Sequence, residues 1–491
     1  MFEELKNESI IPDLDENIKR IEAICNDTSD LLVNRFRCGN VNACLLCCEA
    51  MFSTAMITEL VLHPLMWVPE SINDAYTLFD FIQNKLLLSA DRLEVTNYAD
   101  LFRTLNSGFA VVIADGIPLA LSFGVQGFER RSVGEPSSEG NILGSHEGFC
   151  EVIRINMSLL RRRLKSPLFH MELFTLGTEC KTDVCLCYMH DRVSKDFIAQ
   201  IKQRLRKIEL EAILTSGYVR PFLESERAHI FDSVGTSERP DVVCAKLIEG
   251  RVALLIDGIP FALTMPKLIT ESFQTLDDYC FKPFYATFIR LLKYAAFFIS
   301  IFLPSIYVAF GVHHPDMLNP TLMDILREGE EKAPFPLLAE ALGVLLMYEI
   351  IRESGLRLPR GVGGTVSIVG GLIIGDAAVS SGLISTPMLT IAAVSVLSGF
   401  VISDFAPQIA ILRIVFLICG GLFGLFGIAA GATVVLFNIC ATESFGYPIS
   451  SPISPFDLKA MRDTALRLGF RRLQKGNFTI KKLRSGEHGD E

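Results

Sequence analysis

The chain has 491 residues, a formal net charge of −10, and a composition in which half of the residues are hydrophobic. The acidic balance leaves no basic surface of the kind that binds nucleic acid, so we expect no nucleic-acid partner. Thirteen cysteines are scattered along the chain, several inside apolar runs. This usage favours a reducing compartment over a disulfide framework.

The first 28 residues are polar and acidic, and they lack the charged-then-apolar layout of a signal peptide. We expect residues 1–28 to form a flexible tail or a peripheral helix. A CxxC pair follows at Cys44 and Cys47, with no second cysteine or histidine pair at zinc-like spacing. We therefore expect buried strand cysteines there, and neither a metal nor a cofactor.

An internal repeat follows. Residues 108–121 and 250–263 each hold an apolar run, an Asp-Gly-Ile-Pro sequence and a second short apolar run. Asp115-Gly116 and Asp257-Gly258 are separated by a constant offset of 142 residues (257 − 115). Asp-Gly between two β-rich runs predicts a hairpin with a type I′ turn. A ligand-binding loop is the alternative to plain turn chemistry.

A weaker repeat lies earlier in each copy. Residues 43–48 form a strand-like run before a helical stretch at 54–62, and residues 183–189 likewise precede 195–208. Each half therefore reads as an α/β unit with a mixed sheet. We expect a soluble head with one subdomain over residues 29–140 and a second over 141–282.

Two features join these halves. Residues 130–145 are rich in Gly, Ser and Pro, which indicates a linker or an exposed loop. Residues 147–165 then predict a helix that ends in Arg161, Arg162 and Arg163. These arginines either bind phosphate or acidic lipid headgroups, or simply cap the helix C-terminus in solvent.

The last third is expected to be an α-helical, multi-pass membrane domain over residues 283–445, because a spanning helix needs roughly 20 apolar residues. The runs that could span are 294–312, 335–351, 361–375, 377–403 and 414–442. The last run is long for one span and short for two, and a tight hairpin is the alternative if it extends back to Gln408. We expect four to six spans.

Charge predicts which side the ends occupy. Arg290 and Lys293 precede the first apolar run as a basic collar, and the segment 446–491 is a basic tail. Basic flanks favour the cytoplasmic side. The head and the C-terminus are therefore expected to be cytoplasmic.

Carboxylates within apolar helices are functional candidates because they are costly in lipid. Those in this chain are Glu340, Glu349, Asp376 and Asp404. Small residues also recur at helical spacing, at Gly364, Ser367, Gly371 and Gly375 and again at Gly420, Gly424, Gly427 and Gly431. Small faces allow close helix packing. The second stripe is expected to pack; the first either packs or lines a pore with Asp376 at its outer mouth.

Several stretches resemble one known family, the A subunits of spore germinant receptors (the GerA family, which includes the stage V sporulation AF proteins). They include GFCEVIRINMSLLRRRLKSP at 148–167, SERPDVVCAKLIEGRVALLIDGIPF at 237–261, SIVGGLIIGDAAVSSGLIS at 367–385 and SFGYPISSP at 444–452. The resemblance covers residues 30 to 455, in order. One departure is Glu49-Ala-Met-Phe, where the family usually has a turn resembling Asp-Gly-Leu-Val.

The resemblance implies a multi-pass protein of the inner membrane of a bacterial endospore, with two related α/β subdomains. It also implies a ring-like homo-oligomer that acts as a nutrient-gated ion channel, beside a transporter-like B subunit and a lipoprotein C subunit. A non-conducting scaffold that gathers other germination proteins is the alternative, and a secondary transporter is a third. The head has no Walker motif, dinucleotide fingerprint or nucleophile elbow, so we expect no enzyme.

Overall fold

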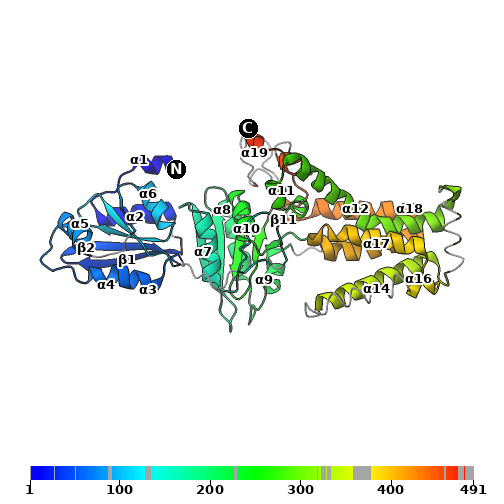
Figure 1. The fold of residues 1–491 in the computed structure, drawn as a ribbon, viewed down its shortest axis with the longest axis horizontal. Helices are drawn as coiled ribbons and strands as arrows, with labels where there is room; N and C mark the ends of the chain where they lie inside the picture. The colour runs from blue at the N-terminus through cyan, green and yellow to red at the C-terminus, as the bar shows by residue number, and fades with distance from the viewer. Residues whose placement is uncertain are drawn as a thin grey trace.

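Three parts follow one another along the long axis of the molecule: two α/β subdomains and a group of long helices (Figure 1). The computed structural model describes residues 2–480 apart from the following: 27, 50, 87–90, 128–133, 137, 226–228, 318, 322–323, 325–327, 329–332, 358–376, 458–459 and 474–479. We call the two subdomains the head and the long helices the base.

The first subdomain is a five-stranded sheet with the order β1-β2-β4-β5-β3. Helices cover both of its faces because side chains along β2 (Val41–Cys48) alternate between two apolar clusters. One cluster holds α2 and α6, and the other holds α3, α4 and α5. The remaining bounds are α1 Phe2–Asn7, α2 Leu14–Cys25, β1 Leu31–Cys38, α3 Thr54–Ile57, the π-helix η1 Thr58–Leu62, α4 His63–Leu65, α5 Ala75–Asn84, β3 Arg92–Val95, α6 Tyr98–Leu105, β4 Phe109–Ala114 and β5 Ala120–Gly124.

The second subdomain repeats this plan, with the strand order β6-β7-β9-β10-β8. Helices α7 and α10 pack on one face and α8 and α9 on the other. Its elements are α7 Ile153–Arg163, β6 Phe169–Leu176, β7 Thr182–Met189, α8 Lys195–Arg206, α9 Ser216–Leu223, β8 Gly235–Ser237, α10 Pro240–Ile248, β9 Val252–Ile256 and β10 Ala262–Met265. The two halves therefore share one topology.

The strand directions correct one expectation. Every pairing between the described strands of both sheets is antiparallel, so the predicted mixed sheets are wrong. The reason is that β1–β2 and β4–β5 are hairpins, and a hairpin forces antiparallel neighbours. The strands expected at 43–48 and 183–189 and the helix expected at 195–208 correspond to β2, β7 and α8.

The first Asp-Gly turn lies in the β4–β5 hairpin, but it is not type I′. Gly116 has a positive φ of 96° and Asp115 does not, and five residues separate the strands. The turn instead binds the N-terminal end of α2. The Asp115 carboxylate accepts a hydrogen bond from the backbone N–H of Leu14 (3.2 Å), and the N–H of Gly116 donates to the carbonyl of Pro12 (2.7 Å).

The second Asp-Gly turn makes the same contacts. Asp257 accepts from the N–H of Ile153 (3.0 Å), and the N–H of Gly258 donates to the carbonyl of Glu151 (2.7 Å). Each turn thus fixes the first residue of one helix, α2 in the first half and α7 in the second. The duplication therefore extends to the helix that precedes each sheet.

The N-terminal residues are helical rather than a flexible tail. Most of the described part of residues 1–28 forms α1 and α2, and α2 buries an apolar stripe against the first sheet. The stripe, Leu14, Ile18, Ile21 and Cys25, has the i, i+4, i+7 spacing of a core-facing helix.

A buried ion pair joins the two subdomains. Asp30 and Arg161 lie 2.6 Å apart, and their side chains are 2% and 3% exposed. Beside the pair, the N–H of Ser29 donates to the carbonyl of Met171 on β6 (2.9 Å). Arg161 is therefore neither solvated nor open to phosphate, in contrast to both alternatives drawn from the arginine run.

The base begins with α12 (Pro283–His313), which follows the short elements η2 (Ile269–Phe273) and α11 (Asp277–Cys280). By length and composition, two helical segments among the described residues could cross a membrane, Pro283–His313 and Ser403–Ala441. The other elements are η3 Pro315–Met317, α14 Leu337–Arg357, α16 Ala378–Ser380, α17 Thr386–Phe400, η5 Ser403–Phe405, α18 Ala406–Ala441, β11 Glu443–Ser444, β12 Tyr447–Pro448, η6 Ala460–Asp463 and α19 Phe470–Leu473. A base of four to six spans stays a prediction.

Helix α18 doubles back at Gly424, whose φ of 60° and ψ of −148° interrupt the helix. A Cβ added at Gly431 would lie 3.0 Å from the ring of Phe416. In a straight helix these residues would be about 22 Å apart, at 1.5 Å per residue. α18 is therefore the tight hairpin that the sequence left as an alternative.

Replacing Gly258 tests the turn chemistry. Gly258 has φ of 79° and open space around it, so Gly258→Val introduces backbone strain without a clash. We expect a loss of about 1 kcal/mol in unfolding free energy. Gly134→Val is the control, because that site also has open space and no positive φ. Equal thermal unfolding midpoints for the two variants would contradict the assignment.

Candidate functional site

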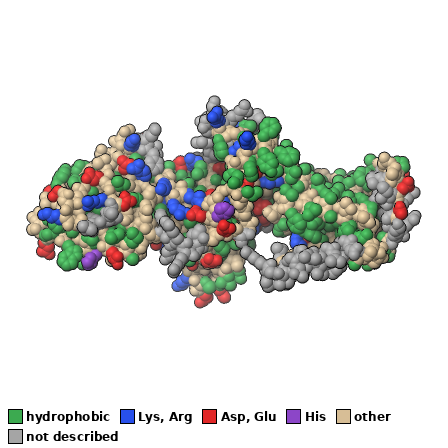
Figure 2. Space-filling view, in the orientation of Figure 1, with side chains coloured by type: hydrophobic (Ala, Val, Ile, Leu, Met, Phe, Trp, Pro, Cys, Tyr) green, Lys and Arg blue, Asp and Glu red, His purple; other side chains and the backbone are tan. Residues whose placement is uncertain are grey.

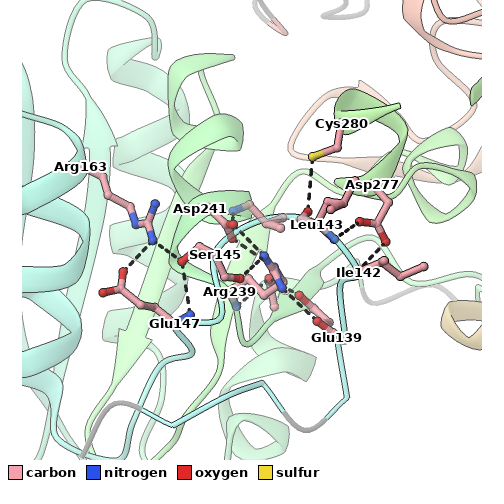
Figure 3. A network of polar contacts seen from close by, with 12 residues as sticks. Glu139, Ile142, Leu143, Ser145, Glu147, Arg163, Arg239, Asp241, Asp277 and Cys280 are labelled. Atoms are coloured by element: carbon pink, nitrogen blue, oxygen red, sulfur yellow. Dashed lines mark hydrogen bonds and ion pairs between the residues drawn. The ribbon is translucent and has the colours of Figure 1, made fainter. Parts of the chain in front are cut away.

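The linker between the two subdomains is held against the second one. We call residues 138–147 the strap; Figure 3 shows its contacts. The guanidinium of Arg239 is buried and donates to the strap carbonyls of Glu139 (3.2 Å) and Ser145 (2.8 Å). Asp241, on α10, fixes the same guanidinium through an ion pair of 2.8 Å. The sequence predicted a linker or exposed loop here, and the strap is a docked segment.

The middle of the strap is bound to α11, which leads into the base. The carboxylate of Asp277 accepts hydrogen bonds from the N–H groups of Ile142 (3.3 Å) and Leu143 (3.1 Å). The thiol of Cys280 donates to the carbonyl of Leu143 (3.3 Å). The strap therefore links the first subdomain both to the second and to the start of the base.

The end of the strap uses the arginine run of α7. Arg162 and Arg163 both donate to the carboxylate of Glu147. Burial acts to raise the pKa of Glu147, but the bonds from the two arginines outweigh it and leave the pKa below its usual value. All three arginines of the run are therefore used inside the head, which neither of the two sequence-based interpretations included.

A cavity of about 290 Å³ lies where the strap, the second subdomain and the base meet. We call it the junction cavity. Charged side chains line part of its walls, among them Glu139, Lys246, Arg251, Lys267, Glu271 and Asp404. The strap supplies Glu139, η5 supplies Asp404, and the second subdomain and η2 supply the others.

Ion pairs balance the charges around this cavity. Glu271 contacts Arg251 and lies 3.4 Å from Lys246, and Lys267 lies 3.1 Å from Asp404. Burial acts to raise the pKa of Glu271, yet Arg251 and Lys246 outweigh it, so the pKa is lowered. Lys246, Arg251 and Lys267 are therefore each paired with an acid. The groups around the cavity connect the head to the base across a polar space.

The head also holds the base through Arg290 at the start of α12. Arg290 is 0% exposed, and its guanidinium donates to Asp278 of α11 and to Asp463 of the C-terminal segment, each at 2.8 Å. Lys293, one turn later, is also buried and faces Asp278 at 3.7 Å. These two residues therefore do not form an exposed basic collar, since Asp278 and Asp463 neutralise them inside the protein; the side of the membrane that they occupy stays a prediction.

The chain after α18 returns into the second subdomain, which the sequence did not predict. Phe445 lies in the turn between β11 and β12, and Tyr447 is the first residue of β12. Both rings pack on Phe197 of α8. Arg204 lies over the Phe445 ring at 4.2 Å. The aromatic residues in SFGYPISSP were the available signal for this insertion.

Among the predicted acidic candidates that the structure describes, Asp404 lines the junction cavity, whereas Glu340 and Glu349 do not. Glu340 is 3% exposed and accepts hydrogen bonds from the N–H (2.6 Å) and hydroxyl (2.7 Å) of Ser385, the N-cap of α17. Glu349 pairs with Arg352 at 2.7 Å and lies 3.9 Å from Arg413. Both acids therefore connect helices of the base.

The second glycine stripe is divided between the arms of the α18 hairpin. A Cβ at Gly420 would lie 2.7 Å from the carbonyl of Ser305 on α12, so these backbones approach closely. Gly424 forms the turn, and Gly427 and Gly431 face the first arm. The first stripe (Gly364, Ser367, Gly371 and Gly375) and Asp376 lie outside the described residues.

A duplicated α/β head fixed through a charged junction to long apolar helices is the architecture of this chain. Residues 19–477 match the family described as Bacillus/Clostridium GerA spore germination protein. The chain therefore belongs to the GerA spore germination protein family.

Curated relatives match head and base together. Spore germination protein KA of Bacillus subtilis (strain 168) is 34% identical over 464 residues, 94% of this chain and 85% of that protein. Uncharacterized membrane protein YfkQ of the same strain is 35% identical, over 95% of this chain and 91% of that one. The crystal structure of the N-terminal domain of the A subunit of the Bacillus megaterium spore germinant receptor GerK3 is 29% identical and covers 53% of this chain and 98% of that one, with a TM-score of 0.42.

Arg239→Gln tests how the strap is held. The variant leaves Asp241 without its cation and frees two strap carbonyls, so we expect a loss of about 3 kcal/mol in stability. Cleavage after Glu139 by a glutamate-specific protease should become faster. Arg206→Gln, at an exposed position on α8, is the matched control. An unchanged cleavage rate in Arg239→Gln would show that this side chain does not hold the strap.

Proposed function

We propose that the chain is the A-type membrane subunit of a spore germinant receptor and forms a nutrient-gated ion channel with B and C partner subunits. The observation that carries the proposal is the match to spore germination proteins over 94% of the chain, which includes both head and base. A head tied by buried charges to apolar helices is an arrangement suited to transmitting a signal into a membrane.

The proposed location is the inner membrane of the spore, with several spans and a ring-like homo-oligomer. The α18 hairpin supports placing the head and the C-terminus on one side. Gln408, on its first arm, lies 3.2 Å from Asp232 of the head, and Asn438, on its second arm, accepts from the N–H of Ile230 (3.1 Å). The chain thus enters and leaves the hairpin at the head. The basic composition of the tail favours the cytoplasmic side.

Gating in this proposal starts at the junction cavity. The head contacts α12 through Asp278, η5 between α17 and α18 through the Lys267–Asp404 pair, and both arms of α18. A displacement of the head would tilt these helices together. The pore itself is proposed to use the segment from residue 361, with Gly364, Ser367, Gly371 and Gly375 on its wall and Asp376 at its mouth. That assignment depends on sequence alone.

A non-conducting scaffold is the second candidate. The first subdomain exposes large apolar side chains at its surface, with Met66 81% and Trp67 70% exposed. Exposed apolar patches are typical of protein interaction surfaces. A scaffold would use such a surface to gather other germination proteins and would not need a pore.

Measurements of ion flux distinguish the channel from the non-conducting scaffold. Purified full-length protein in liposomes, alone and with its B and C partners, should conduct cations when nutrient is added. Asp376→Lys should reduce cation preference, because a carboxylate at a pore mouth concentrates cations. Asp316→Lys, the same charge change in the loop after α12, should have a smaller effect. Absent flux in the assembled complex would favour the scaffold, and equal effects of both variants would contradict the placement of Asp376 at the pore mouth.

Cysteine labelling tests sidedness. A membrane-impermeant maleimide applied from outside should modify Met317→Cys, an exposed position at the far end of α12. The native protein should stay unlabelled, because its exposed cysteines Cys180, Cys280 and Cys440 lie in the head or at the head end of α18. Strong labelling of the native protein would place the head outside.

A further inference from the structure

Helix α12 is longer than a membrane requires. Its 31 residues extend about 46 Å at 1.5 Å per residue. A hydrocarbon core is about 30 Å thick. The uncharged run begins only at Tyr294, so the eleven residues from Pro283 to Lys293, about 16 Å of helix, precede it. We call these eleven residues the α12 extension.

The extension carries an apolar stripe continuous with the span. Phe284, Phe288, Leu291 and Leu292 are all exposed, the first two by 93% and 59%. Their spacing of 4, 3 and 1 places them on one face of a helix. The same face continues through Phe298 and Ile299 of the uncharged run, which are also exposed.

The opposite face of the extension is turned to the head. Arg290 and Lys293 are buried there, and the acids Asp278 and Asp463 neutralise them. Ala286, on the same side, is also buried. The extension therefore has its cations inside the protein and its aromatic residues outside, the reverse of a helix that stands in water.

The C-terminal segment widens this apolar face. It is tied to α12 because the N–H of Arg467 donates to the hydroxyl of Thr287 (3.1 Å). Leu466 and Phe470 are exposed beside it, and Arg467 lies over the Phe470 ring at 4.7 Å. Figure 1 shows α19 next to the first turns of α12, and Figure 2 shows hydrophobic and basic side chains together in this region.

Three exposed cations are close in sequence to the residues of the apolar face. They are Lys282, Arg462 and Arg471. Aromatic side chains flanked by Lys and Arg at the end of an apolar span are the pattern of residues that lie at a membrane–water interface. Such a face is suited to the phosphates and upper acyl chains of phospholipids, with rings inserted about 5–10 Å into the headgroup boundary.

We propose that the α12 extension and the segment around Phe470 bind the headgroup–acyl boundary of a phospholipid bilayer and seat the head against the membrane. The continuity of the stripe with the uncharged run favours lipid over a protein partner, because one uninterrupted surface meets both. The inference rests on the proposed membrane location of α12.

The single tryptophan of the chain makes a direct test available. In a Trp67→Phe background, Phe288→Trp places one fluorophore on the extension. The full-length protein is reconstituted in phosphatidylethanolamine–phosphatidylglycerol vesicles whose acyl chains carry bromine near the headgroup or near the chain end. Bromine near the headgroup should quench the emission of the introduced tryptophan at least about twofold, and bromine at the chain end should quench it less, as expected for an interfacial depth.

Two matched variants separate this inference from the proposed membrane location. Phe298→Trp, within the uncharged run, should be quenched, and by deeper bromine more strongly than Phe288→Trp is, whereas Tyr218→Trp, exposed on α9 of the head, should not be quenched. If Phe298→Trp is quenched and Phe288→Trp is not, the seating of the head is wrong and the membrane location stands. If neither is quenched, both fail.

Other outcomes are equally decisive. Quenching of Tyr218→Trp to the same extent would mean non-specific adsorption and would overturn the inference. Protection of Phe288→Trp from both bromine and aqueous iodide would mean that protein, such as a second copy, covers the face, and would overturn it as well. Phe284→Trp, at the most exposed position, provides the same measurement if Phe288→Trp does not fold.

Discussion

The guanidinium of Arg290 is fully buried where α12 leaves the head, and three separate chain segments are positioned around it. A buried charge is tolerated only when partners replace its hydration. Here Asp278 comes from α11 and Asp463 from the C-terminal segment, and Tyr279 donates to Asp463 at 2.7 Å. Removing one partner of such a pair typically costs about 3–5 kcal/mol. The direction in which α12 enters the base is therefore fixed by electrostatics as well as by packing.

The repeat in the head was predictable because Asp-Gly pairs and apolar strands are local signals. The outer strands were not: β3 exposes three of its four residues and β8 has only three, so neither shows an apolar pattern. Strand direction also depends on which strands become neighbours, and residue patterns do not specify that. The hydrogen bonds of the Asp115 and Asp257 carboxylates were also not predictable, because their partner N–H groups on α2 and α7 lie about a hundred residues away in the chain.

The site was less predictable than the fold, since its contacts join distant segments. Composition marked the strap as a loop, but Arg239 holds carbonyls 94 and 100 residues earlier in the chain. The arginine run on α7 was misinterpreted for the same reason, because Asp30 lies 131 residues before Arg161. The glycine stripe of α18 shows a further difficulty. Counting by helical period assumes one continuous helix, and the turn at Gly424 places its glycines on two arms.

The described contacts restrict how a movement in the head can reach the base. The start of α12, η5 and the head-side ends of both arms of α18 are all bound by the second subdomain, its adjoining segments or the C-terminal segment. The first subdomain connects to these elements through the strap and through the interface around Asp30 and Arg161. Separating that interface would break this ion pair and the hydrogen bond from Ser29 to Met171, which opposes independent motion of the first subdomain. The strap contacts at Ile142 and Leu143 are single hydrogen bonds in an exposed position, each contributing roughly 1 kcal/mol. The movement with the lowest energy is therefore one in which the two subdomains turn as a unit while the strap shifts against α11.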